Sequence, residues 1–284
     1  MKKRLLITGS NGFIGKNFIE YYSKEYEIIE VTKYSKYNIL DLNSLLTINN
    51  IDVVLHFAAK TFVPHSFDNP YEFYEFNIKS TLNIAELCRI KKIKKIIYLN
   101  SYTYGNPQYL PIDEKHPISF HSPYNKSKFL AEEVLFNYLE NYTDVISLRL
   151  FNIYGKYQNN NFLIPSILNQ ISTNEITVKD LNPKRDYLYI KDLIALINII
   201  INTKDANGVY NIGSGASYSV IEIIDMIKTI YKYDFVVKSQ NIVRQNEVMD
   251  CYANINKLKK EFKWSPSYSL YTGLEDYLQE VKNV

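Results

Sequence analysis

The stretch Thr8-Gly9-Ser10-Asn11-Gly12-Phe13-Ile14-Gly15 decides the fold. It follows a short apolar run and leads into a helical pattern, and it holds three of the chain's nine glycines. Between a strand and a helix, such glycines permit a tight turn and a close approach of the backbone to a pyrophosphate, while the helix N-terminus offers unpaired N–H groups. The loop therefore predicts a dinucleotide site, and the alternative is a turn without a ligand.

Alternation of strand and helix patterns continues over the first 150 residues. Apolar runs without polar alternation predict buried strands at 5–8, 28–31, 53–57, 96–99 and 145–150. Helical patterns lie between them, at about 13–24, 42–49, 70–90 and 123–141. Because parallel strands need crossover connections, this order predicts an α/β fold, a doubly wound parallel-sheet Rossmann domain.

Beyond Gly155 the pattern changes to shorter elements of mixed type. Helices are predicted at about 162–172, 191–203, 219–231, 254–262 and 271–282, and strands at 176–178, 187–190 and 209–212. We expect a dinucleotide-binding domain of residues 1–150 plus about 181–204. A smaller C-terminal α+β lobe of residues 151–180 and 205–284 is expected to bind substrate, with the ligand site in a cleft between the two.

Composition excludes several classes of protein. The 284 residues are 46% hydrophobic and 22% charged, which is typical of a folded globular chain. The net charge is +3 and the basic residues are scattered, so no nucleic-acid partner is expected. No apolar run approaches the roughly 20 residues that cross a bilayer, and the N-terminal one is too short for a signal peptide. Two cysteines, Cys88 and Cys251, fit a reduced, cytoplasmic setting, and no His and Cys spacing predicts a metal site.

The end of the second predicted strand bears on the cofactor. A dinucleotide site normally has an acid there for the adenosine ribose, whereas a 2′-phosphate prefers a cation. The sequence is Glu30-Val31-Thr32-Lys33-Tyr34-Ser35-Lys36, so neither Thr32 nor Lys33 is acidic and two lysines are close. This favours NADP(H), with NAD(H) possible, and the alternative is that the lysines only solvate a loop.

A tyrosine four residues before a lysine occurs as Tyr124/Lys128 and as Tyr187/Lys191. Tyr187 lies in a strand-like run, where these positions are far apart. Tyr124 follows Ser122-Pro123 at a predicted helix start, where they share one face. An ammonium near a phenol lowers the tyrosine pKa, so Tyr124 and Lys128 are the candidates for proton exchange with a hydroxyl or carbonyl; a solvated helical pair is the alternative.

These residues resemble the extended short-chain dehydrogenase/reductases that act on nucleotide sugars, within the NAD-dependent epimerase/dehydratase superfamily. The glycine loop and Tyr124-Asn125-Lys126-Ser127-Lys128 are similar to the family's cofactor loop and catalytic motif. Other similar motifs follow in the family's order, from about residue 4 to 276: His56-Phe57-Ala58-Ala59-Lys60, Asn77, Arg149-Leu150-Phe151-Asn152-Ile153-Tyr154-Gly155, Arg185-Asp186-Tyr187, Tyr210-Asn211-Ile212-Gly213 and Arg244.

The resemblance implies roles for individual residues. Tyr124, Lys128 and Ser101 would be catalytic. Cofactor contacts would come from Gly9, Asn11, Gly12, Phe13, Ile14, Gly15, Lys33, Asp41, Leu42, Phe57, Ala58, Ala59, Lys60, Asn77, Tyr124 and Lys128. Substrate contacts would come from Asn100, Asn152, Arg185 and Arg244.

One departure concerns the catalytic Ser or Thr, which the family usually places five residues before the glycine of its Tyr-Gly pair. Counting back from Gly105 gives Asn100, with Ser101 next. We expect Ser101 to serve, and Asn100 is the alternative. The family's dehydratases carry an Asp-Glu pair in this stretch, which reads Asn100-Ser101-Tyr102-Thr103 here, so dehydration is not expected.

The resemblance implies an enzyme that uses NADPH to reduce a 4-keto-6-deoxy nucleotide sugar, for surface polysaccharide biosynthesis. The alternative activity is that of a nucleotide-sugar C4 epimerase that retains NAD, and a remote alternative is a non-catalytic nucleotide-binding module. The resemblance also implies a homodimer formed through the helices predicted at about 70–90 and 123–141.

Overall fold

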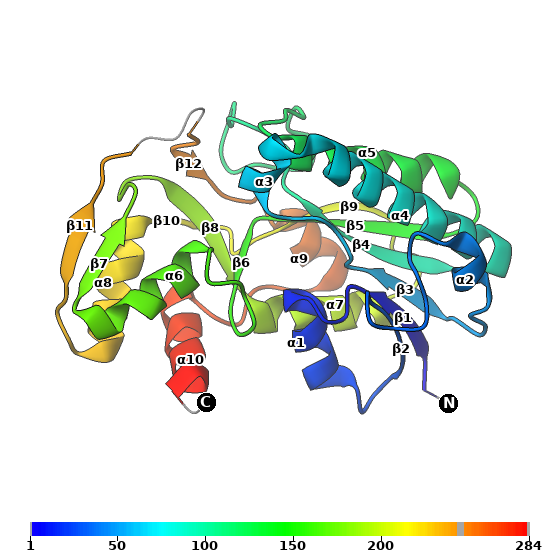
Figure 1. The fold of residues 1–284 in the computed structure, drawn as a ribbon, viewed down its shortest axis with the longest axis horizontal. Coiled ribbons are helices and arrows are strands. Elements are labelled where there is room, and N and C mark those ends of the chain that lie inside the picture. Colours follow the sequence, from blue (N-terminus) through cyan, green and yellow to red (C-terminus); the bar gives the residue numbers. More distant parts are fainter. Residues whose placement is uncertain (1, 243–246, 283–284) are drawn as a thin grey trace. The chain divides into compact units, whose positions relative to one another are not determined.

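The computed structural model describes residues 2–242 and 247–282, and it divides into two units (Figure 1). The first unit comprises Met1–Gly105, Ile118–Leu150 and Ile194–Tyr210. The second comprises Asn106–Pro117, Phe151–Leu193 and Asn211–Val284.

The first unit is organised by a six-stranded sheet in the order β2-β1-β3-β4-β5-β9. Its strands are β1 (Arg4–Thr8), β2 (Glu27–Val31), β3 (Val53–His56), β4 (Lys95–Ser101), β5 (Asp144–Leu150) and β9 (Gly208–Ile212). The first five pair in parallel, and β9 lies beside β5. The prediction of a parallel α/β sheet is confirmed.

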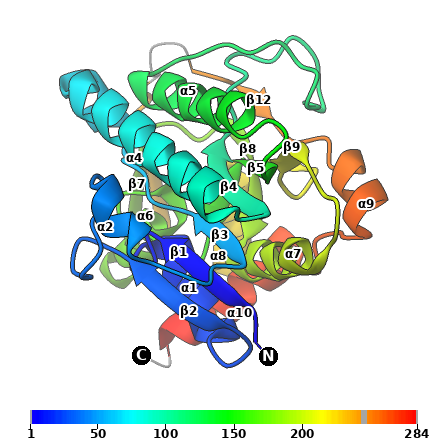
Figure 2. The same cartoon turned by 90° about the vertical axis from the view of Figure 1, so that its right-hand side faces the viewer.

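Helices lie on both faces of this sheet (Figures 1 and 2). One face carries α4 (Pro70–Lys91) and α5 (Pro123–Tyr138), with α2 (Leu42–Leu46) against α4, and the other carries α1 (Phe13–Tyr22) and α7 (Ile190–Asn202). Both long helices have Pro at the first position after a polar N-cap, Asn69 for α4 and Ser122 for α5. A short helix, α3 (Val63–Asp68), was not predicted by the sequence pattern.

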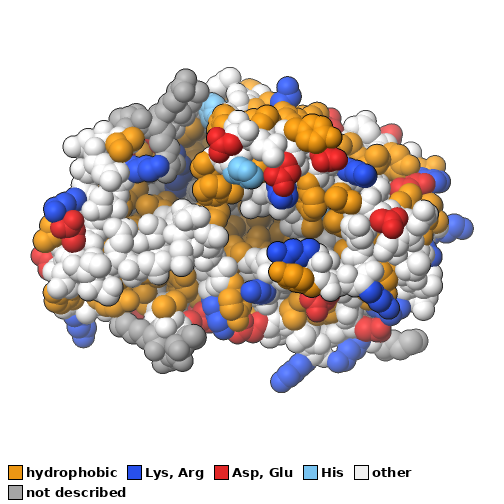
Figure 3. All heavy atoms as spheres, in the orientation of Figure 1, with side chains coloured by type: hydrophobic (Ala, Val, Ile, Leu, Met, Phe, Trp, Pro, Cys, Tyr) orange, Lys and Arg blue, Asp and Glu red, His pale blue; other side chains and the backbone are white. Residues whose placement is uncertain are grey.

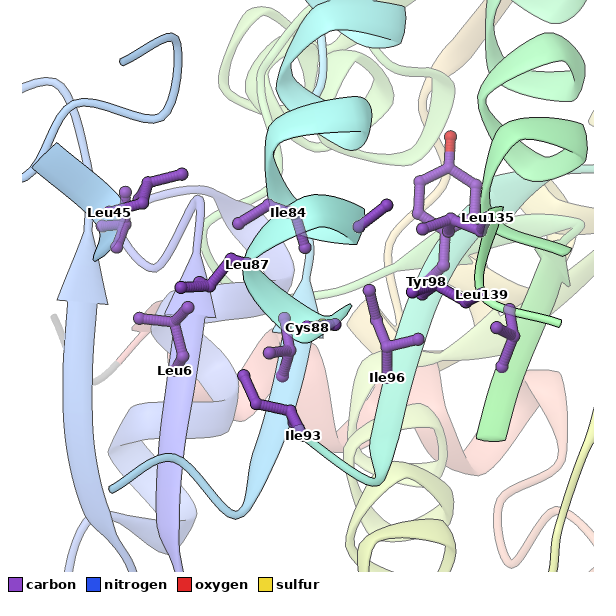
Figure 4. Packing of buried hydrophobic residues seen from close by; sticks show 14 of the residues in the cluster. Leu6, Leu45, Ile84, Leu87, Cys88, Ile93, Ile96, Tyr98, Leu135 and Leu139 are labelled. Atoms are coloured by element: carbon purple, nitrogen blue, oxygen red, sulfur yellow. The ribbon is translucent and has the colours of Figure 1, made fainter. Parts of the chain in front are cut away.

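The core between the sheet and the helices α2, α4 and α5 is almost wholly aliphatic (Figure 4). Leu6 and Ile96 from the strands pack with Ile84 and Leu135 from the helices, and each is fully buried. Each such side chain stabilises the fold by about 1.5–3 kcal/mol relative to an exposed position. Cys88 lies in the same cluster, where burial raises the pKa of its thiol.

The second unit has two small sheets. In the larger, β8 (Lys184–Tyr189) pairs with β6 (Asn152–Tyr154), β10 (Ser217–Ser219) and β12 (Asp250–Cys251), and in the smaller β7 (Glu175–Val178) pairs with β11 (Val236–Ser239). Its helices are α6 (Leu163–Gln170), the 3₁₀ turn η1 (Ile171–Thr173), α8 (Val220–Tyr231), α9 (Asn256–Phe262) and α10 (Leu270–Lys282).

The observed division of the chain differs from the expected one in three segments. Residues 181–193 belong to the second unit because β8 pairs there with β6, β10 and β12. Residues 205–210 belong to the first unit because β9 extends its sheet. Residues 106–117 join the second unit, where the Ile112 N–H donates to the carbonyl of Tyr252 at 2.9 Å.

The surface carries basic and acidic side chains interspersed with apolar ones on the face shown in Figure 3. In the described part of the chain, no helix is both long and apolar enough to cross a membrane.

Candidate active site

The glycine loop is packed so tightly that two of its glycines have no room for a side chain. Gly9 has φ +70°, and a Cβ there would lie 2.8 Å from the Ala58 nitrogen. A Cβ on Gly15 would lie 2.6 Å from the carbonyl oxygen of Gly9. The Gly12 N–H donates to that same carbonyl at 2.9 Å, which closes the turn. The loop is thus a backbone cradle at the start of α1, which fits a phosphate group.

The loop lies at the point where the order of the sheet reverses. The strand β1 has β2 on one side and β3 on the other, and ligands of open α/β sheets bind at the carboxyl ends of such strands. Phe57, Ala58, Ala59 and Lys60 follow directly after β3, and the Ala58 N–H donates to Thr8 Oγ1 at 3.1 Å. The candidate cofactor segments after β1 and β3 are therefore neighbours.

Asn77 of α4 fixes the segment after β3. Its Oδ1 accepts the Lys60 N–H at 2.8 Å, and its Nδ2 donates to the Lys60 carbonyl at 3.2 Å and to Ser127 Oγ of α5 at 2.9 Å. The Asn77 side chain is buried. Asn77 thus joins α4, the segment after β3 and α5 by hydrogen bonds.

The end of β2 shows a feature that the sequence analysis missed. Lys33 is exposed, with its Nζ 4.8 Å from the Tyr34 ring centre. Glu30, two residues before Thr32, accepts a hydrogen bond from Ser10 Oγ in the glycine loop at 2.7 Å. Its position at the penultimate residue of β2 is the signal that could have pointed to it.

Two further candidates, Asp41 and Leu42, lie at the start of α2. The Asp41 carboxylate caps this helix by accepting the Asn43 N–H at 3.0 Å, and Leu42 is the first helical residue. The structure therefore shows a capping role for Asp41.

Tyr124, Lys128 and Ser101 lie at the carboxyl edge of the same sheet. Tyr124 is in the first turn of α5, Lys128 is one turn further on, and Ser101 ends β4. The Ser101 and Tyr124 side chains are hydrogen-bonded, while part of the Tyr124 surface stays accessible. In contrast, Tyr187 is in the strand β8, as predicted, so the second tyrosine–lysine pair does not share a helix face.

The direction of the Tyr124 pKa is opposite to the one expected. Loss of hydration raises the pKa of Tyr124 to about 12, although the hydrogen bond from Ser101 opposes this. The Lys128 ammonium lies over the Tyr98 ring, 4.0 Å from its centre. Burial lowers the pKa of Lys128 to about 7, although the Glu132 carboxylate opposes this. At neutral pH the phenol is therefore a proton donor.

His56, the last residue of β3, is a buried and neutral side chain. Burial, with a smaller effect of Lys128, lowers its pKa to about 3. Its Nδ1 and Nε2 are hydrogen-bonded to Thr8 Oγ1 at 2.8 Å and Thr81 Oγ1 at 2.9 Å. The ring thus connects β1 to α4 without adding a charge near Lys128.

A buried ionic cluster beside the site was also missed. Glu132 of α5 forms an ion pair with Arg149 of β5, and its Oε2 accepts from Asn100 Nδ2 at 2.7 Å and Ser147 Oγ at 2.5 Å. Arg149 also donates to the Tyr104 hydroxyl at 3.0 Å. The available signal was the spacing of Tyr124, Lys128 and Glu132, each four residues apart on one helix.

Of the candidate substrate residues, Asn100 lies in β4 of the first unit, whereas Asn152 and Arg185 lie in the second. Asn152 begins β6 and its Nδ2 donates to the Asp186 carbonyl at 3.1 Å. Arg185 of β8 is ion-paired with Glu247 and donates to the carbonyl of Lys184 at 2.8 Å. Arg244 lies outside the described residues.

The first unit thus combines a phosphate-shaped backbone cradle with a proton donor at one sheet edge. Among residues 2–242 and 247–282, no group of three or more His, Cys, Asp and Glu side chains could hold a metal ion. The residues present fit a dinucleotide, because the loop offers backbone N–H groups where side chains would block it.

Comparison with known proteins identifies the family. Residues 5–213 match the model of the NAD dependent epimerase/dehydratase family. The chain is 30% identical over 276 residues to the UDP-glucose 4-epimerase of Bos taurus, covering 86% of this chain and 78% of that one. It is 27% identical over 301 residues to the GDP-6-deoxy-D-mannose reductase of Pseudomonas aeruginosa, covering 99% and 97%.

A solved structure, that of RMD from Pseudomonas aeruginosa complexed with NADPH, superimposes with a TM-score of 0.90 at 25% identity and covers 99% of each chain. The chain belongs to the NAD dependent epimerase/dehydratase family, an extended short-chain dehydrogenase/reductase family. It is therefore an enzyme that uses a nicotinamide dinucleotide.

Proposed function

We propose that this enzyme uses NADPH to reduce the C4 ketone of a 6-deoxy nucleotide sugar. The observation that carries the proposal is the partly accessible Tyr124 phenol, hydrogen-bonded to Ser101 and held in its protonated form at neutral pH. Reduction of a ketone needs a proton donor beside the forming alkoxide, and this phenol supplies one. The similarity to a GDP-6-deoxy-D-mannose reductase supports the same chemistry.

The proposed cofactor contacts come from the cradle and the segments around it. The dinucleotide supplies a hydride when bound. The proposed binding residues are Gly9, Asn11, Gly12, Phe13, Ile14, Gly15, Lys33, Asp41, Leu42, Phe57, Ala58, Ala59, Lys60 and Asn77, with Tyr124 and Lys128. The tight packing of the loop and the bonds of Asn77 support this assignment.

Ser101 is the proposed carbonyl-polarising residue. Its side chain is bonded to Tyr124, so it lies where a carbonyl oxygen would meet the phenol. Asn100 is less suited to this role, because its Nδ2 donates to Glu132 and its Oδ1 accepts the Ser101 N–H at 2.8 Å. The geometry supports Ser101 over Asn100.

For the substrate, we propose that Asn152, Arg185 and Arg244 contact the nucleotide sugar. A guanidinium fork matches the oxygens of a diphosphate. Arg185 would then exchange its pairing with Glu247 for the substrate.

For the cofactor, NADP(H) is proposed over NAD(H). The residues after β2 are Thr32 and Lys33, and Lys33 is exposed and free to move toward a 2′-phosphate. The nearby Glu30 is already bonded to Ser10. The NADPH in the similar reductase structure supports the same preference.

A C4 epimerase that retains NAD is the second candidate. The observation in its favour is the 30% identity to a UDP-glucose 4-epimerase. Such an enzyme would use Tyr124 as a base in its first half-reaction and as an acid in its second, so the same residue serves both candidate activities. Tightly held NAD in the purified protein would favour the epimerase and oppose the reductase.

The proposal extends to a cytoplasmic homodimer that serves surface polysaccharide biosynthesis. Exposed apolar side chains on α4 and α5, namely Tyr71, Leu82, Ile90 and Tyr138, support a partner on these helices. Analytical ultracentrifugation should give a dimer, and a monomer at micromolar concentration would contradict it.

The activity is tested with NADPH and NADH against 4-keto-6-deoxy sugars linked to dTDP, GDP, CDP and UDP, followed by absorbance at 340 nm. We expect steady NADPH oxidation with one of them, and Tyr124→Phe should lower its rate by about 10²–10⁴-fold. Tyr142→Phe, which changes an exposed tyrosine beyond the end of α5, is the control and should keep the wild-type rate. No oxidation with any sugar would oppose the proposal.

A further inference from the structure

Glu132 is a buried carboxylate that accepts hydrogen bonds from more side chains than a structural ion pair needs. It is 1% exposed, and it accepts from Arg149, Asn100 and Ser147, all of which are also buried. A buried ion pair is weak evidence for stability, because apolar side chains of the same volume are often as stable. The arrangement therefore calls for an explanation other than stability.

Hydrogen bonds connect Glu132 to the candidate catalytic residues. It holds the Nδ2 of Asn100, whose Oδ1 accepts the Ser101 N–H, and the Ser101 side chain is bonded to Tyr124. Glu132 also lies one helical turn after Lys128 on α5, so the two side chains share a face. The Glu132 carboxylate thus reaches Ser101 and Tyr124 through Asn100, and it reaches Lys128 along the helix face.

We propose that Glu132 is a positioning residue for Tyr124, Lys128 and Ser101: it fixes the end of β4 through Asn100 and places a negative charge one helical turn from Lys128. This inference rests on the proposed function of that site. Arg149 holds the carboxylate in place from β5.

The other groups named around Lys128 carry no negative charge at neutral pH, so Glu132 supplies it. From β4, Tyr98 presents its ring and burial raises the pKa of its hydroxyl well above the usual value; from β3, His56 is neutral. From α5, Tyr124 is protonated at neutral pH, and Glu132 raises the pKa of Lys128 against the effect of burial.

Arg149 remains charged as the partner of Glu132. Burial lowers its pKa, but the hydrogen bond and charge of Glu132 outweigh this and raise it overall. Removing Glu132 therefore leaves Arg149 buried without its carboxylate and Lys128 without the anion one turn along its helix face.

The test is an NMR titration of the protein labelled with [ε-¹³C]lysine, in which the Lys128 signal is assigned by its absence in Lys128→Met. The wild-type signal should titrate at about pH 7. In Glu132→Gln the midpoint should fall by about one pH unit or more, the usual effect of losing an adjacent opposite charge. Glu133→Gln, which removes a charge from an exposed neighbour, should leave the midpoint unchanged. An unmoved midpoint in Glu132→Gln overturns the proposal.

Loss of Glu132 alone leaves Arg149 buried without its carboxylate, which could prevent folding. The double variant Glu132→Gln/Arg149→Met removes both charges and should fold, because replacing both partners of a buried pair is often neutral. Its Lys128 midpoint should still lie below the wild-type value. A return to the wild-type midpoint would assign the effect to unpaired Arg149 and overturn the proposal.

The titration needs no substrate, so it is separate from the test of the proposed function. A fallen midpoint in a protein that reduces no keto sugar would oppose the function and keep the electrostatic role of Glu132. An unmoved midpoint in an active reductase would oppose only that role. In an active enzyme, Glu132→Gln should also move the alkaline limit of kcat to lower pH, which a purely structural defect would not do.

Discussion

Replacing Gly15 by Ala tests the glycine loop through a clash that the structure defines. The added Cβ would lie 2.6 Å from the Gly9 carbonyl oxygen and from the Ser10 Cα, and ordinary contact begins at 3.4 Å, so the loop must move by about 0.8 Å. Such overpacking costs about 1–3 kcal/mol, and the better helix propensity of Ala offsets up to about 1 kcal/mol. We expect the melting temperature to fall by about 8 °C at most.

The effect on cofactor affinity should be much larger. A shift of this size breaks at least one hydrogen bond from a loop N–H to a phosphate, and a hydrogen bond to a charged group contributes about 1.5–3 kcal/mol. The Kd for NADPH, measured by calorimetry, should therefore rise by about 10- to 150-fold. Binding within twofold of the wild type would refute the assignment of the loop.

Gly213→Ala is the control for instability without damage to the loop. Its Cβ would lie 2.3 Å from Asp186 Oδ2 in the second unit. This variant should lose stability in thermal unfolding while the folded protein keeps its affinity for NADPH. An equal loss of NADPH binding in both variants would mean that affinity follows general stability.

Three further predictions concern single side chains. Tyr124→Phe should keep the wild-type Kd for NADPH while turnover falls, and lost NADPH binding would contradict its role as a proton donor. Because the pKa of Lys128 is about 7 in the folded protein and near its usual 10.5 when unfolded, the unfolded chain binds the extra proton between these values. The free energy of unfolding, measured in urea, should thus rise with pH across this window. Its slope should exceed that of Lys128→Met by up to about 1.4 kcal/mol per pH unit. Equal slopes in the two proteins would contradict the buried ammonium. Lys33→Glu should weaken NADPH by about 10-fold or more and leave NADH nearly unchanged, since it removes one charge-assisted contact to the 2′-phosphate; parallel losses would contradict that contact.

Much of the first unit could be predicted from the sequence because its signals are strong and local. The buried parallel strands are continuous apolar runs, and Ser122-Pro123 marks the start of α5 within one residue. The strands β6, β10 and β12 have two or three residues each, too few to show a period, and they pair through β8. That pairing is long-range, which is why residues 181–193 were expected in the other unit.

The sequence predicts that Tyr124 and Lys128 belong to one candidate site, but it does not predict the pKa values of these residues. Residue spacing placed Tyr124 and Lys128 on one helix face, and the structure agrees. Spacing carries no information on burial, and burial raises the pKa of Tyr124 where the lysine alone was expected to lower it. It also left Asn100 and Ser101 as alternatives, because only the fold brings Glu132 to the Asn100 side chain.

In the proposed reduction, Tyr124 acts in its protonated form. Its raised pKa keeps the phenol protonated at neutral pH, which is the form that protonates an alkoxide. An ammonium with a pKa of about 7 is half protonated at neutral pH, so the charge beside Tyr124 responds to its surroundings.

The most direct test of the central claim follows the hydride itself. The enzyme is incubated with the 4-keto-6-deoxy nucleotide sugar that it accepts and with NADPH deuterated at nicotinamide C4 on either face, and the product is analysed by NMR. The account predicts that one of the two cofactors delivers one deuterium to C4 of the sugar for each NADPH oxidised. A sugar product without deuterium at C4, or one formed without net oxidation of NADPH, would contradict it.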